Sequence, residues 1–433
     1  MWAEIISIGS ELTSGQSLDT NSQWLSAELG SLGIPTIVHT TISDELDLHV
    51  SAFKIAAGRA DLVIVTGGLG PTQDDLTHEA MAATAGVGLF LDPGSLAAIE
   101  AFFARRSRPM AERNRIQAMF PEGAEPLPNP VGTAPGISMN IGRSIFFCLP
   151  GIPSEMRLMF HEQVVPRLQA RNLTQRVIVY RKINLFGRGE SDIEAKAMDL
   201  TARGRVPEVG ITAHEATISF RIRGEGATRE EALLQTEPTA RTIYERFGTL
   251  VLGEGAVDVP EAVFELLQRK GATLATAESC TGGLVAQMIT ALAGVSPFYR
   301  GGVVSYSNEA KTTLLGVAED LIRRHGAVSP EAAEAMAVGA RVRLGADIAV
   351  STTGVAGPSG GTLEKPVGLV YIGLASEAGV RNQRIDLGPE QPRALIQRRS
   401  AKIALNLVRL ELLLMKDVGQ TETMSQDHRR MLS

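Results

Sequence analysis

A serine and a cysteine stand side by side in the stretch TAESCTGG, between a run typical of a strand and a run typical of a helix. Ser279 and Cys280 are followed by Gly282 and Gly283, which allow a ligand to approach the backbone closely. Since N–H groups at the start of a helix can hold a phosphate or stabilise an oxyanion, this turn can form a nucleophile site at the end of a strand. A helix cap beside a small buried cysteine explains the same residues, and on these residues alone it is favoured.

A second stretch, GGVVSYSNEAK, brings a lysine to the start of a helix. Tyr306 is expected at the end of a strand, Asn308 at the cap of the next helix and Lys311 in the first turn of that helix. Because the N-terminal end of a helix is positive, this position lowers the pKa of Lys311, and a lysine with a lowered pKa can act as a general base. On propensity alone, a solvated surface lysine is the simpler interpretation.

A glycine-rich loop follows a predicted buried strand in the run TTGVAGPSGGTLEKPVG. Gly354 and Gly357 lie in this loop, which extends to Gly361. Such loops can hold phosphate groups through their N–H groups, and they also occur as long turns. The run alone does not decide between these two interpretations.

In the N-terminal part, the stretch TGGLGPTQDDLTHEA lies between a strand and a helix. Gly67, Gly68 and Gly70 allow close approach of a ligand, and Asp74 and Asp75 offer adjacent carboxylates. Carboxylate oxygens are the ligands that Mg²⁺ prefers beside a diphosphate. Acidic residues at a helix start are also stabilised by the helix dipole without any ligand, so this alternative stays open.

Length, charge and cysteine content exclude several classes of protein. The 433 residues exceed one ordinary core and predict two or three domains, and the net charge of −6 argues against a broad basic surface for nucleic acid. Cys148 and Cys280 lie outside any CxxC spacing, which argues against a disulfide framework or a cysteine zinc site and fits a reducing compartment. No run reaches the ~18 apolar residues of a membrane span. We therefore expect a cytoplasmic protein that binds neither membranes nor nucleic acid.

Strand and helix signals divide the chain into domains. Residues 1–170 alternate apolar strand-like runs with amphipathic helices, which indicates an α/β fold with a parallel sheet. Residues 171–255 carry the pattern of a small α+β domain, to which we assign no chemistry. Residues 256–415 return to the α/β pattern and open with a helix capped by Asp258. Residues 416–433 are polar and unperiodic, and we expect a flexible tail.

Taken together, the C-terminal motifs resemble a known family. TAESCTGG, GGVVSYSNEAK, HGAVS and TGVAGPSGGTLEKPVG are similar to the nicotinamide mononucleotide (NMN) deamidase domain of the CinA competence/damage-inducible proteins. The resemblance implies hydrolysis of NMN to nicotinate mononucleotide and ammonia without a metal or organic cofactor. It implies Ser279 as nucleophile, Lys311 as the base that activates it and Tyr306 as a third member of the site, with Cys280 as a supporting neighbour.

The same resemblance implies a set of substrate contacts in this domain. Arg393 corresponds only loosely to an arginine of the family, because the loop GPEQPR departs from the usual pattern, and we expect it to contact the phosphate. The other expected contacts are Thr281, Gly282, Gly283, Gly354 and Gly357.

The N-terminal motifs resemble the first domain of the same family, which is related to the molybdopterin-binding fold. GSELTSGQSLDTNSQWL, TGGLGPTQDDLT, NPVGTAPG and LPGIPSEM carry this resemblance. It implies hydrolysis of ADP-ribose to AMP and ribose 5-phosphate with Mg²⁺ or a similar divalent metal, and it implies Asp44 and Asp75 as the acidic pair. The further residues expected by this resemblance are Glu11, Asp74 and Asp75 as metal ligands and Gly67, Gly68, Gly70 and Asn114 as substrate contacts.

Functions from different classes fit this sequence. The first is a bifunctional hydrolase of pyridine-nucleotide salvage that acts on NMN and ADP-ribose, and we expect it to be a homo-oligomer. The second is a partner protein in competence or DNA repair whose N-terminal domain only binds a nucleotide or molybdopterin. A third is molybdenum cofactor synthesis by the N-terminal domain. Incubation of the purified protein with NMN and ADP-ribose, with and without a divalent metal, distinguishes the first from the others.

Overall fold

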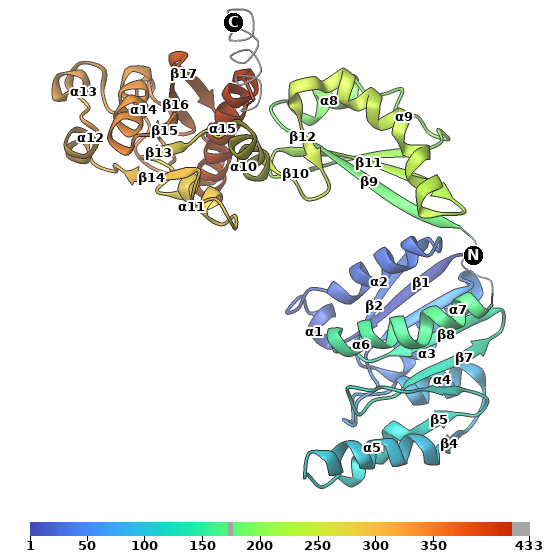
Figure 1. The fold of residues 1–433 in the computed structure, drawn as a ribbon. Coiled ribbons are helices and arrows are strands. Elements are labelled where there is room, and N and C mark those ends of the chain that lie inside the picture. The colour runs from blue at the N-terminus through green and yellow to red at the C-terminus, as the bar shows by residue number, and fades with distance from the viewer. Residues whose placement is uncertain (172–175, 418–433) are drawn as a thin grey trace, which may run out of the picture. The chain divides into compact units, whose positions relative to one another are not determined.

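The structure is a computed structural model that describes residues 1–171 and 176–417 (Figure 1). The chain forms two compact units, Met1–Tyr180 with Arg223–Thr236, and Arg181–Ile222 with the chain from Glu237 onward. The expected middle domain, residues 171–255, contributes chain to both units, and its boundaries stay predictions. The tail expected at residues 416–433 lies, from residue 418 on, outside the described residues. No helix in the described part is both long and apolar enough to cross a membrane.

The N-terminal unit contains a six-stranded sheet in the order β2-β1-β3-β8-β7-β6. Its four parallel strands are β1 (Ala3–Ile8), β2 (Thr36–Ile42), β3 (Leu62–Thr66) and β8 (Ser144–Leu149). Two antiparallel pairings extend the sheet through β7 (Gly136–Ile141) and β6 (Glu125–Leu127). β1 and β3 are buried along their whole length, as expected for central strands covered on both faces.

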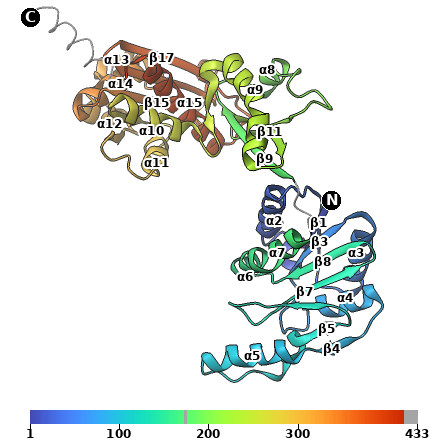
Figure 2. The same cartoon turned by 45° about the vertical axis from the view of Figure 1, so that its right-hand side comes forward.

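Helices cover both faces of this sheet. The helices of the unit are α1 (Ser10–Thr13), α2 (Thr20–Ser31), α3 (Leu46–Arg59), α4 (Thr77–Ala85), α5 (Pro93–Arg105), η1 (Glu112–Ala118), α6 (Pro153–Met159), η2 (Phe160–Val164) and α7 (Val165–Ala170). α3 and α4 lie on one face of the sheet, and α2 and α6 lie on the other (Figure 2). Phe53 of α3 and Met81 of α4 belong to one hydrophobic cluster, and Leu25 of α2 and Met156 of α6 belong to another. A separate two-stranded sheet pairs β4 (Leu89–Leu91) with β5 (Met119–Pro121).

The middle segment has the α+β fold that its sequence predicts. Four strands lie in the order β10-β11-β9-β12, and their bounds are β9 (Val177–Leu185), β10 (Glu208–His214), β11 (Thr217–Gly226) and β12 (Val251–Glu254). The helical elements of the segment are α8 (Glu190–Ala195), α9 (Arg229–Phe247) and η3 (Gly248–Leu250). Phe220, Ile222 and Ile243 belong to a hydrophobic cluster of this segment.

The C-terminal domain is built on a five-stranded sheet in the order β14-β13-β15-β16-β17. Three strands are parallel, β13 (Leu274–Glu278), β14 (Tyr299–Val304) and β15 (Ile348–Gly354), and two are antiparallel, β16 (Leu369–Ser376) and β17 (Gly379–Asp386). Its helices are α10 (Val259–Lys270), α11 (Leu284–Thr290), α12 (Asn308–Leu315), α13 (Glu319–His325), α14 (Pro330–Leu344) and α15 (Arg393–Leu414). The expected α/β fold is confirmed.

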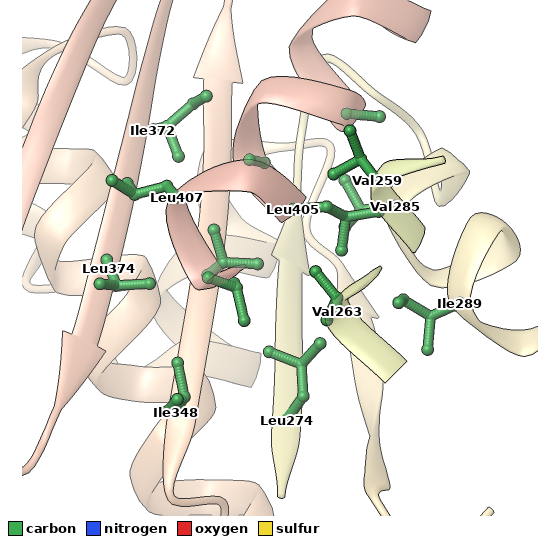
Figure 3. Close-up of a cluster of buried hydrophobic side chains, with 14 of the residues drawn as sticks. Val259, Val263, Leu274, Val285, Ile289, Ile348, Ile372, Leu374, Leu405 and Leu407 are labelled. Carbon is green, nitrogen blue, oxygen red and sulfur yellow. The ribbon is translucent and has the colours of Figure 1, made fainter. Parts of the chain in front are cut away.

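Two groups of helices pack on opposite faces of this sheet. On the first face, Val263 of α10, Ile289 of α11 and Leu405 of α15 meet Leu274 of β13 in one cluster (Figure 3). On the other face, α12 and α14 pack against side chains of β13 and β15. The carboxyl ends of β13, β14 and β15 therefore share one edge, where α11, α12 and the glycine-rich loop follow.

The start of α10 is tied to α15 through an ion pair whose lysine is buried and whose aspartate is one third exposed. Asp258 caps α10 in a capping box with Glu261, as its sequence predicts. Lys402 of α15 is 4% exposed, and its Nζ lies 2.6 Å from Asp258 Oδ2. Although burial opposes the charge, hydrogen bonds from Lys402 and Thr217 hold the pKa of Asp258 below its usual value.

Replacement of Asp258 by alanine is expected to destabilise the C-terminal domain strongly. Asp258→Ala leaves the buried Lys402 ammonium with only two neutral acceptors among the described residues, Glu215 O and Thr217 Oγ1, and the loss of the carboxylate partner of a buried charge typically costs about 3–5 kcal/mol. Ser329→Ala removes the cap of α14 without stranding a charge and should cost only about 1 kcal/mol. Unfolding in urea measures the free energy of unfolding of both variants. The double variant Asp258→Ala/Lys402→Met should recover much of the stability that Asp258→Ala loses. Equal effects of the two single variants would contradict the role given to this ion pair.

Candidate active sites

Ser279 stands at the carboxyl end of a buried strand. β13 ends at Glu278, and the N–H of Ser279 donates to Thr352 O of β15 at 2.9 Å, which fixes the turn against the sheet. Ser279 Oγ lies 3.0 Å from Lys311 Nζ of α12. The two residues that the sequence predicts as nucleophile and base are therefore in contact.

Lys311 is buried, with 1% of its surface exposed. Its Nζ donates to Ser305 O at 2.8 Å, and no carboxylate in the described part of the chain pairs with it. Burial lowers the pKa of Lys311, and the smaller effect of Cys280 opposes this. The interpretation as a solvated surface lysine is wrong, because α14 and the sheet cover this side of α12. A neutral amine in this place can accept the proton of Ser279 while it donates to Ser305 O.

The helix that carries Lys311 is capped one residue earlier than expected. Ser307, not Asn308, is the cap, and its hydroxyl accepts a hydrogen bond from Ala310 N at 3.0 Å. Both residue types cap helices well, so the sequence alone could not place the boundary.

Cys280 is buried beside the nucleophile and does not form a thiolate readily. Burial raises the pKa of its thiol to about 12, against smaller opposing effects of hydrogen bonds from its own backbone and from Thr352. A protonated thiol is a weak nucleophile at neutral pH. The carbonyl oxygen of Cys280 accepts a hydrogen bond from Gln397 Nε2 of α15 at 2.8 Å, so this residue anchors the turn.

Glu278, which the sequence analysis did not single out, binds the N–H groups at the start of α11, whose cap is Gly283. Its side chain is 1% exposed and accepts hydrogen bonds from Thr281 Oγ1 at 2.7 Å and from the N–H groups of Gly283, Val285 and Ala286 at 3.0, 3.0 and 2.8 Å. A carboxylate at a helix N-terminus is stabilised by both the hydrogen bonds and the helix dipole. In the sequence, the position of Glu278 as the single charged residue at the end of the run ATLATAE could have indicated this role.

The N–H groups of Gly282 and Gly283, which could have held an oxyanion, already donate hydrogen bonds within the protein. Gly282 N donates to Ser279 O at 3.1 Å, and Gly283 N donates to Glu278. The N–H groups of Cys280 and Thr281 donate to no other residue in the part that the structure describes. They are therefore the backbone donors beside Ser279 that remain for a ligand, the N–H of Cys280 in exchange for its contact with its own thiol.

Three further expected site residues meet at the same edge of the sheet. Arg393, the first residue of α15, donates from Nη2 to the Tyr306 hydroxyl at 2.9 Å and from Nη1 to Gly357 O at 2.7 Å. The Tyr306 side chain is 62% exposed and has no hydrogen bond to Ser279 or Lys311. Close packing requires a glycine at position 354, because an added Cβ would lie 2.6 Å from a carbonyl oxygen of β16.

The N-terminal candidate site is an acidic cavity of about 380 Å³ at the carboxyl ends of β1 and β3. Five carboxylate side chains line it, and no lysine, arginine or histidine is among its described lining residues. The five carboxylates belong to Glu11, Asp44, Asp74, Asp75 and Glu155. A diphosphate placed here alone would be repelled, so the cavity calls for a cation.

Asp44 and Asp75 are each held by a neighbouring hydroxyl residue. Asp44 Oδ2 accepts from the N–H and the hydroxyl of Ser10, both at 2.7 Å, and Asp75 Oδ2 accepts from the N–H of Thr72 at 2.8 Å. Within the described residues, neither Oδ1 atom has a hydrogen-bond partner. Thr72 also bonds to Asp74, and this hydrogen bond is the main cause that lowers the pKa of Asp74.

The glycines of the first loop are required by close packing. An added Cβ would lie 2.5 Å from a backbone oxygen of β1 at Gly67, and 2.3 Å from a hydroxyl of α4 at Gly68. At Gly70 it would lie 2.4 Å from Asp75 Oδ2. The Asp75 carboxylate can therefore occupy this position only because residue 70 is a glycine.

Asn114 lies outside the lining of the acidic cavity. It is buried and donates to Gln117 Oε1 at 3.0 Å, and Gln117 Nε2 donates in turn to Leu69 O at 3.2 Å. Gln117 lines the cavity, as does Glu155 of α6, and the sequence analysis missed both. Their positions follow from η1 and α6, which no local pattern connects to the acidic loop.

The residues of this cavity fit a divalent metal only together with a substrate. No group of three His, Cys, Asp or Glu within residues 1–171 and 176–417 is arranged to hold a metal ion. Mg²⁺ in nucleotide sites usually takes one or two carboxylates and completes its shell with water and substrate phosphates. The Oδ1 atoms of Asp44 and Asp75, in a cavity without a basic side chain, fit that mode.

Comparison with protein families matches most of the chain. Residues 257–412 match the family described as CinA C-terminal domain, residues 4–170 the probable molybdopterin binding domain, and residues 180–253 the damage-inducible protein CinA KH domain. Among solved structures, the competence/damage inducible protein CihA from Agrobacterium tumefaciens is 38% identical, with a TM-score of 0.35, over 36% of this chain and 93% of that chain.

Relatives of similar length match most of the chain in one alignment. A putative competence-damage inducible protein of Halothermothrix orenii is 42% identical over 379 residues, which are 88% of this chain and 91% of the relative. A CinA-like protein of Gloeobacter violaceus is 44% identical over 415 residues, 95% of this chain and 96% of the relative. At this identity and coverage, the chain belongs to the CinA family.

Proposed function

We propose that the chain is a hydrolase with two activities. Its C-terminal domain deamidates NMN to nicotinate mononucleotide and ammonia, and its N-terminal domain cleaves ADP-ribose to AMP and ribose 5-phosphate with a divalent metal. The observation that carries the proposal is the contact of 3.0 Å between Lys311 Nζ and Ser279 Oγ, made by a lysine that is buried.

The deamidation begins with proton transfer from Ser279 to the neutral amine of Lys311. Ser279 Oγ attacks the carboxamide carbon, and the N–H groups of Cys280 and Thr281 stabilise the oxyanion that forms. Lys311 then returns the proton to the amide nitrogen, the C–N bond breaks and ammonia leaves. Water adds to the resulting ester, again with Lys311 as base, and releases the acid and Ser279.

The nucleotide end of NMN is anionic and requires a cation near the nucleophile. Arg393 uses two of its donors for Tyr306 and Gly357, and its guanidinium is exposed, so further N–H groups remain for a phosphate. This arrangement supports Arg393 as the phosphate contact and Tyr306 as the residue that orients it. Tyr306 then acts through Arg393 and not on the Ser279 proton.

In the N-terminal domain, the chain positions two carboxylates and a tight loop around the diphosphate. A bound divalent ion supplies positive charge that makes a phosphorus atom open to attack by water. Asp44 and Asp75 would hold that ion, and Ser10 and Thr72 fix the orientation of the two carboxylates. Asp74 adds negative charge at the rim.

A role as a partner protein in competence or DNA repair makes a different prediction. The names of the Halothermothrix orenii and Gloeobacter violaceus relatives refer to competence damage and to CinA. If the chain acts only as a partner, the purified protein should turn over neither NMN nor ADP-ribose, with or without a divalent metal. Release of ammonia from NMN decides between the two functions.

Removal of the serine hydroxyl is expected to abolish deamidation. Ser279→Ala should lower kcat on NMN by about 10³-fold or more, since loss of the nucleophile removes most of the rate enhancement of a hydrolase. Cys280→Ala should retain most of the activity, because the thiol is protonated and buried. Ammonia release measures both variants, with thermal unfolding as the check on folding. An active Ser279→Ala with an inactive Cys280→Ala would reverse the assignment.

The pH dependence of deamidation should report the base. Because the neutral form of Lys311 is the active one, kcat/KM on NMN rises with pH and levels off above the pKa of Lys311, which burial places below the ~10.4 of a free lysine. Lys311→Arg keeps the charge but cannot lose a proton, and kcat should fall by about 10²-fold or more. Near-wild-type kcat for Lys311→Arg, with a changed KM for Lys311→Ala, would make Lys311 a phosphate anchor instead.

The N-terminal activity should depend on the Asp75 carboxylate and on its position. Asp75→Asn should abolish ADP-ribose hydrolysis and leave deamidation intact, because the two sites lie in separate compact units. Gly70→Ala should impair the same activity by displacing Asp75. Gly58→Ala on α3 meets no atom within 4 Å and serves as the control without effect on either activity. Parallel loss of both activities in folded Asp75→Asn would count against independent sites.

A further inference from the structure

Ser305 lies directly beside the amine of Lys311. β14 ends at Val304, and the N–H of Ser305 donates to Glu278 O at 2.8 Å, so the chain stays paired with β13 for one residue beyond the strand. The carbonyl oxygen of Ser305 accepts a hydrogen bond from Lys311 Nζ at 2.8 Å. Residue 305 therefore contacts the amine through its main chain.

The side chain of Ser305 points to the face of the sheet that α12 and α14 cover. Val303, two residues earlier on β14, packs on that face with Ala277 of β13 and Met336 of α14. Since side chains alternate along a strand, residue 305 points to the same face as Val303, and it is 0% exposed there. Lys311 belongs to α12, so the hydroxyl and the amine lie on the same side of the sheet.

The hydroxyl of Ser305 has no hydrogen-bond partner in the described part of the chain. A buried hydroxyl without a partner is costly, and such a group calls for an explanation. Ser351 of β15 is equally buried on the same face, but its Oγ donates to Ala333 O of α14 and accepts from Gly373 N at 3.2 Å. The unpaired hydroxyl at residue 305 is thus not a general property of this face.

The amine of Lys311 has one direction without a partner. Besides its bond to carbon, a lysine nitrogen has three directions for hydrogen bonds. Ser279 Oγ occupies one of them at 3.0 Å, and Ser305 O occupies another at 2.8 Å. No other residue of those described accepts a hydrogen bond from Nζ, and Lys311 is only 1% exposed, so the third direction does not face solvent. The unpaired hydroxyl and the unused direction of the amine therefore belong to two groups in contact.

We infer that Ser305 is a positioning residue of the C-terminal site, and that its hydroxyl accepts the N–H of Lys311 that no other group receives. A rotation about χ1 between staggered positions moves Oγ without moving the main chain. Once O and Oγ of Ser305 hold the two N–H groups of the neutral amine, the lone pair of Lys311 is directed at the Ser279 hydroxyl.

This arrangement prepares the first proton transfer. The O–H bond of Ser279 breaks, and a third N–H bond forms on the lone pair of Lys311 while the other two N–H groups stay on Ser305. The inference rests on the proposed deamidation and adds a residue to it. The hydroxyl of Ser305 acts through Lys311 and does not touch the substrate.

The groups around Lys311 leave the Ser305 hydroxyl as the main adjustable partner of its charge. The helices packed on α12 face this core with Leu321 of α13 and Met336 of α14, which do not titrate. The neighbouring titratable side chains are those of Glu278, Cys280 and Tyr306. Glu278 is held by the N–H groups of α11, and Tyr306 is exposed and bonded to Arg393. Cys280 affects the pKa of Lys311, but less than burial does.

The pKa of Lys311 tests the inference without any substrate. The full chain is labelled with ¹³C at the Cε atoms of lysine, the signals are followed by NMR as the pH rises, and Lys311→Arg identifies the signal of residue 311. Ser305→Ala removes an acceptor of the ammonium, so the charged form loses a hydrogen bond and the pKa of Lys311 should fall by about one unit.

The kinetics on NMN should follow the titration. In Ser305→Ala, the midpoint of the pH profile of kcat/KM should move to lower pH by the same amount as the pKa of Lys311. Above that midpoint, kcat should fall by about three- to tenfold, because the lone pair is no longer directed at Ser279. Ser305→Thr keeps a hydroxyl at this position and should retain the pKa of the parent protein.

Ser351→Ala is the matched control. It removes an equally buried hydroxyl from the same face, but one that already has its partners. It should lower the free energy of unfolding and leave the pKa of Lys311 unchanged. If Ser305→Thr does not fold, the contrast between Ser305→Ala and Ser351→Ala decides.

An unchanged pKa of Lys311 in folded Ser305→Ala would overturn the inference. An equal shift in Ser351→Ala would do the same, because the shift would then come from altered packing. A lowered pKa in Ser305→Ala, together with a parent protein that releases no ammonia from NMN, would overturn the proposed activity and leave the contact between the hydroxyl and the amine standing.

Discussion

The lowered pKa of Lys311 requires that no carboxylate reach its amine, and the alternation of side chains along β13 meets this requirement. Leu274 packs on the face covered by α11 and α15, and Ala275 and Ala277 pack on the face covered by α12 and α14. Glu278 therefore points to α11, where N–H groups hold it, and Ser279 points to α12 and Lys311. A shift of one residue would pair Glu278 with Lys311, raise the lysine pKa and remove the base.

Charge is arranged in opposite ways at the two candidate sites. The C-terminal site buries a lysine without a counter-charge, so the neutral amine is favoured and a proton can be exchanged with Ser279. The acidic cavity gathers Asp44, Asp75 and other carboxylates without a basic neighbour in its described lining, so its charge is balanced only when a cation enters. Both sites lie at the carboxyl ends of parallel strands, where loops can vary without disturbing the sheet.

The sequence predicted the elements, and the residues that meet at the C-terminal site, better than it predicted the local hydrogen bonds. The α/β pattern, the long helix α15 and the pair of Ser279 and Lys311 could be read from periodicity and motif. The burial of Lys311 could not, because it depends on packing between α12, α14 and the sheet. The hydrogen bond from Gly283 N to Glu278 could not be predicted from the sequence either, because it joins a side chain at the end of the strand to the start of the next helix. The place of Asn114 outside the lining of the cavity was hidden for a similar reason, because it depends on Gln117, which lines the cavity and accepts a hydrogen bond from Asn114.

The position of Arg393 depends on contacts along the whole of α15. In its first turns this helix donates from Arg393 to Gly357 and from Gln397 to the turn at Cys280. Further along, Lys402 pairs with Asp258, and Arg409, which is 2% exposed, donates to the carbonyl groups of residues 249 and 251 in the middle segment. Because a packed helix moves as a unit, these distant hydrogen bonds help to fix the guanidinium beside Tyr306. The middle segment, which carries no chemistry of its own in the sequence, thus contributes to the geometry of the C-terminal site.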